Sequence, residues 1–289
     1  MQANKIKNRI ISWARFKLNL PPVFVEAKIF EKEFHVREGT IRSVPDYDDA
    51  WLIACASKAE IIFDIGANIG QSAFLELTPD GVDNLLLVEP NPLALSVAAE
   101  NLIHNHLIHR VNMKCAFVSD GSNAKIDFFT VGSGAAGSMY PNHAKTASKK
   151  NSHYFVPSIT IDELCEQYGI PDLIKIDIEG AESYALAGAK ACLLKQQTRF
   201  LIEMHSNTDL PMEENARKVL QICQENNYKA WYLSRQKELT NPEDVSDRGR
   251  CHLLLQPCSW PWPELVTQIQ QSAPIDRKLQ ELIFHQTAS

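Results

Sequence analysis

The sequence lacks several patterns that would each assign the chain to a class. Its seven cysteines include no C-x-x-C pair, it contains no internal repeat, and no apolar run approaches the roughly 18 residues of a membrane span. Scattered cysteines in an odd number favour reduced thiols in a cytoplasmic protein over a disulfide framework or a zinc site. We therefore expect no transmembrane segment and a cytoplasmic location.

An excess of positive charge is also missing. The chain has 35 acidic against 29 basic residues, for a formal net charge of −6. Nucleic-acid binders depend on basic residues that neutralise phosphates, so we expect no nucleic-acid partner. With 289 residues, 45% of them hydrophobic, the chain is long enough for one large α/β domain or two smaller ones.

Acidic residues are absent from the first 20 positions, which carry five lysines and arginines. The spacing of apolar residues predicts a short basic amphipathic helix over about 6–18. Such a helix either packs on the domain or makes weak contact with a membrane surface. We divide the chain into an N-terminal helical arm (1–50), a central α/β domain (51–257) with an insertion at 119–156, and a C-terminal helical tail (258–289).

Short apolar runs alternate with helical patterns through the central domain. This alternation predicts a parallel sheet with helices on both faces, whose ligands bind at the carboxyl ends of the strands. The last two strands have no clear crossover helix between them, so we expect one of them to be antiparallel. The predicted strands cover 61–67, 85–90, 111–118, 158–161, 173–179, 198–205, 229–234 and 251–257.

The stretch "FDIGANIGQSAF" (63–74) follows the first of these strands. Its glycines permit a tight turn and close approach to a ligand, but the spacing D-x-G-x-x-x-G differs from the G-x-G-x-x-G of dinucleotide folds. An ordinary turn between a strand and a helix is the simpler interpretation. Glu89, however, ends the next strand, where a carboxylate can accept both hydroxyls of a ribose. Asp64 and Glu89 together suit a ligand with an amino-acid end and a ribose end, such as S-adenosylmethionine.

Charged residues crowd the stretch "KIDIEGAE" (175–182), directly after the apolar pair Leu173 and Ile174. Unpaired charge is costly to bury, so either the strand runs out to the surface or its carboxyl end forms an active site.

Four stretches resemble the FkbM-type S-adenosylmethionine-dependent methyltransferases: "FDIGANIGQSA", "LLLVEPNP", "ITIDELCEQYGIPDLIKIDIEGAESYALAGA" and "FLIEMH". The resemblance covers about half of the chain. It implies a class I methyltransferase fold, a Rossmann-like three-layer α/β sandwich with a seven-stranded, mixed but mostly parallel sheet. It also implies O-methylation of a hydroxyl on a sugar, glycan or small natural product.

The resemblance implies roles for particular residues. The methionine end of the cofactor is expected beside the turn after the first strand, the ribose at Glu89 with Asn91 nearby, and the adenine at the end of the third strand. The expected cofactor-binding residues are Asp64, Gly66, Asn68, Gly70, Glu89, Asn91, Ala116 and Phe117.

Methyl transfer to a hydroxyl requires a group that removes its proton. Asp177, Glu203 and His205 are the candidates, because they end two strands that should be neighbours, and His205 has the ordinary pKa of a base. The same three residues could instead hold a divalent cation such as magnesium. Lys175 is either catalytic or a structural partner of Asp64 or Asp177.

Glu179, Ser138, Tyr140 and His143 are candidate contacts to the acceptor; the last three lie in the long loop, which could equally cover the site without direct contact. Two other functions compete with catalysis of methyl transfer. A non-catalytic binding module would not need the set of Asp64, Gly70, Glu89 and Asp177, and an NAD-dependent oxidoreductase is disfavoured by the glycine spacing.

Overall fold

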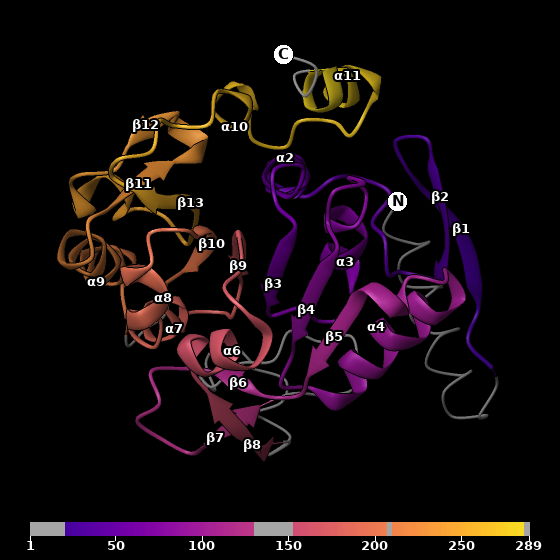
Figure 1. Ribbon diagram of the computed structural model, residues 1–289, viewed down its shortest axis with the longest axis horizontal. Coiled ribbons are helices and arrows are strands. Elements are labelled where there is room, and N and C mark those ends of the chain that lie inside the picture. Colours follow the sequence, from indigo (N-terminus) through magenta and orange to yellow (C-terminus); the bar gives the residue numbers. More distant parts are fainter. Residues whose placement is uncertain (1–20, 130–152, 207–209, 286–289) are drawn as a thin grey trace.

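The computed structural model describes residues 21–129, 153–206 and 210–285. Strands and helices alternate through most of this part of the chain, in accord with the pattern of apolar runs (Figure 1). The strands are β1 (Phe24–Ile29), β2 (Lys32–Arg37), β3 (Ile61–Ile65), β4 (Asn84–Val88), β5 (Val111–Lys114), β6 (Phe117–Val118), β7 (Lys125–Phe129), β8 (His153–Ile159), β9 (Leu173–Ile176), β10 (Arg199–His205), β11 (Tyr228–Tyr232), β12 (Lys237–Glu238) and β13 (Arg250–Pro257). The α-helices are α2 (Asp49–Ala56), α3 (Gln71–Glu76), α4 (Pro92–His104), α6 (Ile161–Tyr168), α7 (Glu182–Ala187), α8 (Lys190–Leu194), α9 (Met212–Glu225), α10 (Glu264–Gln268) and α11 (Arg277–His285).

The main sheet has the strand order β12-β11-β13-β10-β9-β3-β4-β5. Strands β5, β4, β3, β9 and β10 are parallel, whereas β13 runs antiparallel to both of its neighbours, β10 and β11. The predicted fold class and the antiparallel strand near the end of the chain are therefore confirmed. The sheet has eight strands and not seven, because the two-residue strand β12 pairs with the end of β11.

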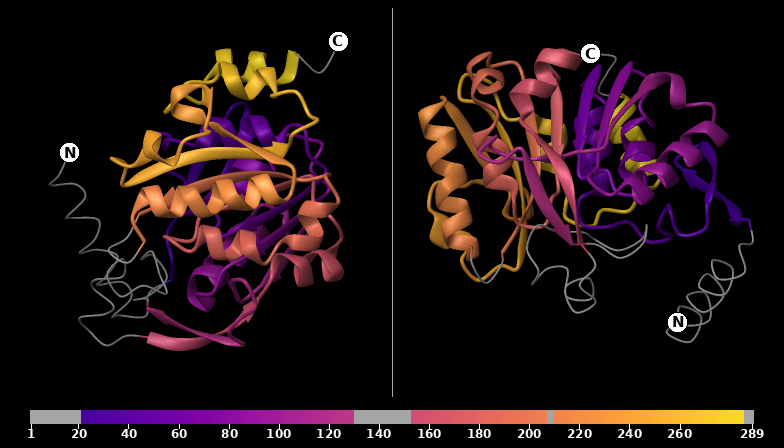
Figure 2. Two further views of the ribbon diagram at one scale, coloured as in Figure 1. Left: turned by 90° about the vertical axis from the view of Figure 1, so that its left-hand side faces the viewer. Right: turned by 90° about the horizontal axis from the view of Figure 1, so that it is seen from below.

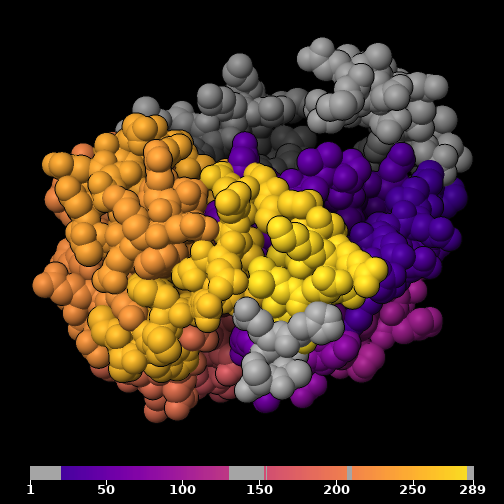
Figure 3. All heavy atoms as spheres, turned by 90° about the horizontal axis from the view of Figure 1, so that it is seen from above, coloured from indigo at the N-terminus to yellow at the C-terminus, as the bar shows by residue number. Residues whose placement is uncertain are grey.

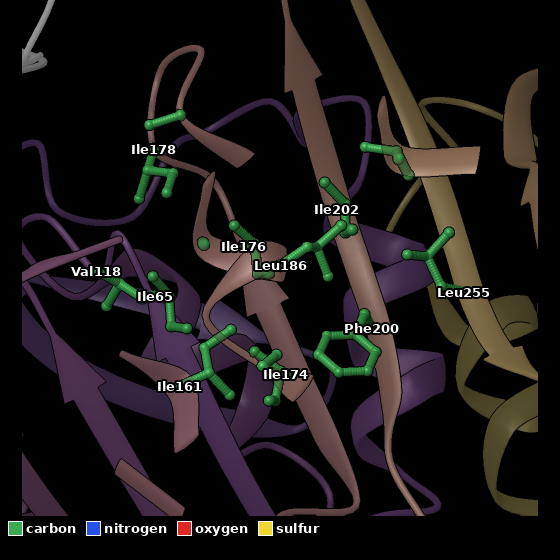
Figure 4. Packing of buried hydrophobic residues seen from close by; sticks show 14 of the residues in the cluster. Ile65, Val118, Ile161, Ile174, Ile176, Ile178, Leu186, Phe200, Ile202 and Leu255 are labelled. Carbon is green, nitrogen blue, oxygen red and sulfur yellow. The ribbon is translucent and has the colours of Figure 1, made fainter. Parts of the chain in front are cut away.

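The two faces of the sheet bury separate hydrophobic clusters, since successive side chains of a strand point to opposite faces. Ile174, Ile176, Phe200 and Ile202 pack against the layer that contains α6, α7 and α9 (Figure 4). The intervening positions pack against α2, α3 and α4 on the other face. Figure 2 shows these helical layers on either side of the strands. The positions that face the α2 and α3 layer also include four polar residues: Asp64, Lys175, Glu203 and His252.

The segment before α2 differs from the expected helical arm. Residues 24–37 form an antiparallel hairpin of β1 and β2, in which Phe34 and Val36 are buried while the residue between them is exposed. This period of two buries one side of a strand and not one stripe of a helix, so the prediction of a helical arm is wrong for this segment. The helix predicted over 6–18 lies outside the described residues.

The strand predicted over 111–118 is two strands. It breaks after Lys114, and Phe117–Val118 pairs with β8 in a second sheet of order β6-β8-β7. Strand β7 and the beginning of strand β8 in this small sheet belong to the expected insertion at 119–156.

The C-terminal segment carries two short helices and crosses the face of the sheet that α2 covers. The indole Nε1 of Trp51 on α2 donates to the carbonyl oxygen of Ile269, 2.9 Å away. In Figure 3 this segment (yellow) lies across the boundary between the 210–260 region and the N-terminal residues. None of the described helices combines the length and the hydropathy that a membrane crossing requires.

Candidate active site

A cavity of about 260 Å³ lies at the carboxyl ends of the parallel strands. Four regions contribute to its wall: the turn after β3, the ends of β4, β9 and β10, the segment that leads into α2, and strands β6 and β7 of the small sheet. Its lining residues include Thr40, Arg42, Asp46, Asp48, Asp49, Gly66, Ala67, Asn68, Glu89, Phe117, Phe128, Lys175, Asp177, Glu179 and Glu203.

The turn after β3 brings the ends of three strands together. The amide of Gly66 donates to the carbonyl oxygen of Val88 on β4, 2.9 Å away. Gly66 has a φ of +88°, and a Cβ at this position would lie 1.9 Å from the backbone oxygen of Asp177. Only glycine therefore allows β9 to end against this turn.

Glu89 projects from the end of β4 into the same cavity. Its carboxylate accepts hydrogen bonds from the backbone amides of Asn68, at 2.9 Å, and Asn91, at 2.8 Å. Burial raises its pKa to about 7, although these two bonds oppose the shift. The bonds hold the carboxylate beside the turn, where the sequence predicted a ribose contact.

Of the other expected cofactor residues, Phe117 lines the cavity. Gly70 is not among the lining residues; it is the N-cap residue of α3, with a φ of +87°. Asn91 instead caps α4, its side chain accepting bonds from the amides of Leu93 and Ala94. Ala116 is buried behind the cavity wall.

Asp64 also lies behind the wall and reaches the site through Lys175. The ammonium Nζ of Lys175 is 3.0 Å from Asp64 Oδ1 and 3.4 Å from the carbonyl oxygen of Gly66. Burial by itself lowers the pKa of Lys175, but the charges of Asp64, Asp177 and Glu76 outweigh it and hold this pKa above its ordinary value. The ion pair with Asp64 is in accord with the structural alternative for Lys175.

Asp177 follows β9, where the chain leaves the sheet. Its Oδ2 lies 3.9 Å from Lys175 Nζ, and its side chain remains 30% exposed. Burial raises its pKa to about 7, against the opposing charge of Lys175. A carboxylate with this pKa in a cavity has the properties of a general base.

His205 does not have the ordinary pKa of a base. Burial lowers its pKa, but the hydrogen bond from Nδ1 to Glu182 Oε1, at 3.1 Å, and the charges of Glu182, Asp177 and Glu179 raise it to about 10. These carboxylates favour the imidazolium form of His205, whose Nε2 lies 3.6 Å from Glu203 Oε1 and 3.8 Å from Glu179 Oε2. The raised pKa disfavours His205 as the base, because the ordinary value applies only to an isolated side chain.

Glu203 lies at the centre of the charged groups. Burial raises its pKa, but His252, His205 and Arg250 outweigh this effect and lower the pKa to about 2. Arg250 Nη1 is 2.6 Å from Glu203 Oε1. As predicted, Asp177, Glu203 and His205 meet: one ligand atom from each lies within 4.8 Å of the other two.

Residues 40–49, which lead into α2 and include its first residue, form a strap along the cavity. The buried side chain of Asn101 on α4 donates to Thr40 Oγ1 at 2.9 Å and to the carbonyl oxygen of Ile69 at 3.4 Å. At the other end, Gln71 Nε2 donates to Asp49 Oδ1 at 3.3 Å. Hydrogen bonds through Asn101 and Gln71 thus link both ends of the strap to the turn after β3 (residues 66–70, the glycine turn) and to the start of α3.

Sequence reasoning missed the strap, Arg250 and His252. Asp46, Asp48 and Asp49 fell within the segment that the sequence assigned to the helical arm (1–50). Arg250 and His252 face the site because β13 is antiparallel, and its register sets them opposite His205 and Glu203. An antiparallel strand begins where its parallel neighbours end, which is the signal that could have found them. Of the expected acceptor contacts, Glu179 lines the cavity, whereas Ser138, Tyr140 and His143 lie outside the described residues.

The strand order, the antiparallel β13 and the turn after β3 define a class I, Rossmann-like methyltransferase fold. Residues 64–230 match the family model of the methyltransferase FkbM domain, and the chain belongs to this family.

Among curated proteins, the chain is 31% identical over 165 residues to the 2-O-methyltransferase NoeI of Sinorhizobium fredii, a match that covers 52% of this chain and 65% of that protein. It is 29% identical over 76 residues to a tRNA1(Val) (adenine(37)-N6)-methyltransferase of a Flavobacteriaceae bacterium, over 26% of this chain and 33% of that protein. The chain thus spans less than two thirds of either relative. A crystal structure of the methyltransferase FkbM from Methylobacillus flagellatus KT matches with a TM-score of 0.43 and 18% identity, over 68% of this chain and 43% of that one.

Proposed function

We propose that the protein is an S-adenosylmethionine-dependent O-methyltransferase that acts on a hydroxyl of a sugar, a glycan or a small natural product. One observation carries the proposal: Glu89 and Asp177 face a single cavity from the carboxyl ends of β4 and β9. Glu89 can accept hydrogen bonds from the ribose of the cofactor, and Asp177 can take the proton of the acceptor hydroxyl. The name of the relative NoeI, a 2-O-methyltransferase, supports oxygen as the methylated atom.

The cavity residues fit the cofactor. Glu89 can accept the two ribose hydroxyls, Phe117 offers an apolar surface for the adenine, and the backbone of Gly66 to Asn68 can lie beside the methionine end. Asp46, Asp48 and Asp49 add negative charge that favours a cationic ligand. The bound cofactor supplies an electrophilic methyl group on a sulfonium ion.

We assign Asp177 as the general base. Its partly exposed carboxylate can take the proton of an acceptor hydroxyl, and the positive charges of Lys175 and His205 stabilise its ionised form. Glu182 holds His205 in place through Nδ1, which leaves Nε2 directed toward Glu179 and Glu203. His205 therefore acts as a fixed positive charge and not as the base.

A magnesium ion on Asp177, Glu203 and His205 is the alternative way to activate the hydroxyl. Protonated His205 cannot donate a lone pair, so a metal ion at this cluster would first have to displace its proton. This requirement favours the metal-free base at Asp177. Added magnesium is expected to leave the rate of methyl transfer unchanged.

Two other functions receive less support. Adenine methylation usually relies on an aromatic strip after the fourth strand that stacks on a flipped base, and this chain has "DIEG" there. A binding module without catalysis has no need for a glycine turn that brings Asp177 against the cofactor cavity.

The seven free cysteines support a reducing, cytoplasmic setting.

Transfer of a labelled methyl group tests the proposal. The full chain is incubated with methyl-labelled S-adenosylmethionine and a panel of neutral sugars, glycans and polyhydroxylated natural products. We expect base-stable label in at least one acceptor, and a rate lowered about 10²- to 10⁴-fold in Asp177→Asn. Asp83→Asn, at an exposed site, is the matched control. An unchanged rate in Asp177→Asn would refute its role as the base, and label only in nitrogen-linked products would refute O-methylation.

A further inference from the structure

A second cluster of potential metal ligands lies on the strap side of Glu203. It consists of Asp48 at the end of the strap, Glu203 on β10 and His252 on β13. One ligand atom from each residue lies within 4.8 Å of the other two. The three residues come from distant parts of the chain, and the pairing of β10 with β13 sets Glu203 directly opposite His252.

One buried atom of this cluster lacks a hydrogen bond within the described part of the chain. His252 is only 3% exposed, and its Nε2 has no hydrogen-bond partner there. It lies 3.7 Å from Glu203 Oε1, which is itself paired with Arg250 Nη1 at 2.6 Å. A buried polar atom without a partner costs roughly 1–3 kcal/mol, so the unpaired nitrogen of His252 indicates a missing ligand.

We propose that Asp48, Glu203 and His252 bind a divalent transition-metal ion. Two carboxylates and one imidazole match the ligand preferences of zinc, cobalt and manganese, whereas magnesium favours oxygen ligands alone. Neighbouring ligand atoms of a tetrahedral zinc site lie roughly 3.3 Å apart, as follows from zinc–ligand bonds of about 2.0–2.1 Å. The distance of 3.7 Å between Glu203 and His252 is close to that value. Asp48 completes the site by a small inward movement.

Arg250 is the group that competes with the ion. Its guanidinium lies 2.6 Å from Glu203 Oε1 and balances that charge when no metal is bound. It has other partners to which it can turn, since it also lies 3.7 Å from Asp46 and 4.5 Å from the ring centre of Tyr47. Metal and guanidinium are therefore alternative cations for one carboxylate.

The ion would link the strap to the sheet. Asp48 is the N-cap residue of α2, and its side chain makes no capping hydrogen bond. Coordination would tie this end of the strap to β10 and β13 and so hold one wall of the cavity in place. The proposal concerns this structural link and does not depend on the methyl acceptor.

Cobalt binding to the untagged full chain tests the proposal, because Co²⁺ reports its ligands by visible absorption and can then be displaced by Zn²⁺. Two isosteric variants distinguish the site from the overlapping cluster of Asp177, Glu203 and His205. We expect one equivalent of Co²⁺ in the wild type, binding at least tenfold weaker in Asp48→Asn and unchanged in Asp177→Asn. The absence of a capping bond at Asp48 means that Asp48→Asn leaves the fold intact, which circular dichroism verifies.

Two further variants sharpen the result. His252→Gln should remove the d–d bands of bound Co²⁺, whereas His205→Gln should keep them. Arg250→Gln should strengthen Co²⁺ binding several-fold, because it removes the competing cation. Absence of stoichiometric binding in the wild type would overturn the proposal and leave a water molecule to satisfy these atoms. Loss of binding in Asp177→Asn but not in Asp48→Asn, or no change in Arg250→Gln, would also overturn it.

Discussion

Lys175 and Asp64 form a buried ion pair beneath the candidate active site. The two residues are direct neighbours in the parallel pairing of β9 with β3, and Nζ lies 3.0 Å from Oδ1. The side chain of Asp64 is fully buried, that of Lys175 is 7% exposed, and Ser72 donates a further hydrogen bond to Asp64. The pair joins the ends of the two strands that carry the glycine turn and Asp177. Its position explains why charged residues end a buried strand in "KIDIEGAE".

Removal of Lys175 is predicted to be severely destabilising. Lys175→Met keeps most of the side-chain volume but leaves Asp64 as a buried charge without a partner, which costs about 3–5 kcal/mol in the free energy of unfolding. The exposed pair of Lys237 and Asp244, 2.7 Å apart, is the matched control, and Lys237→Met should cost less than about 1 kcal/mol. Urea unfolding measures both variants, and equal losses would refute a special role for the buried pair.

Gly66 is predicted to tolerate no side chain. In Gly66→Ala the new Cβ meets the backbone oxygen of Asp177 at 1.9 Å, so the turn and β9 must separate. Gly169 has nearly the same φ, +90° against +88°, but a Cβ added there would have no atom of the described residues within 4 Å. Gly169→Ala should therefore cost only the backbone strain of a residue at φ +90° and ψ 172°, about 1–3 kcal/mol. Thermal unfolding and S-adenosylhomocysteine binding compare the two variants; comparable losses in both would show that the close approach is unimportant.

The folded protein is predicted to lose stability as the carboxyl of Glu89 ionises. Its pKa is about 7 in the fold and near 4.5 in the unfolded chain, so between these values the folded state binds more protons than the unfolded state. The free energy of unfolding therefore decreases as pH rises from about 4 to 7, by an amount on the order of 1–3 kcal/mol from this residue. Glu89→Gln removes this contribution. A difference between wild type and Glu89→Gln that stays constant over this range would contradict the raised pKa.

Glu182 is predicted to keep His205 protonated. In Glu182→Gln the imidazolium loses its hydrogen-bonded carboxylate, and the pKa of His205 should fall from about 10 by at least about one unit. Nitrogen-detected NMR of the imidazole across pH 6–11 measures the change. Glu225→Gln, on the exposed face of α9, serves as the control. A His205 pKa near its ordinary value in the wild type would refute the assignment of a fixed positive charge.

The fold and the glycine turn after β3 could be predicted from the sequence because they depend on local patterns. Apolar runs of strand length, a glycine turn after β3 and an acidic end to β4 each lie within a few consecutive residues. The state of His205 could not be read in this way, since Glu182 acts on it only after α7 has packed beside β10. Asn91 caps α4, a local pattern with Pro92 that the sequence did show, and its amide binds Glu89; a contact of Asn91 with the cofactor stays a prediction. The strap and β13 reach the site through tertiary contacts, so their residues carried no signal in their own neighbourhood.

The most direct test of the central claim is calorimetric titration of S-adenosylhomocysteine into the wild type, Glu89→Ala and Glu31→Ala. Glu31 is 75% exposed in a hairpin turn and serves as the matched control. We predict a micromolar dissociation constant for the wild type and Glu31→Ala and no measurable binding to Glu89→Ala, with NAD producing no heat in any of them. Binding of NAD, or binding of S-adenosylhomocysteine that survives the loss of Glu89, would contradict the account of this cavity as a methyltransferase cofactor site.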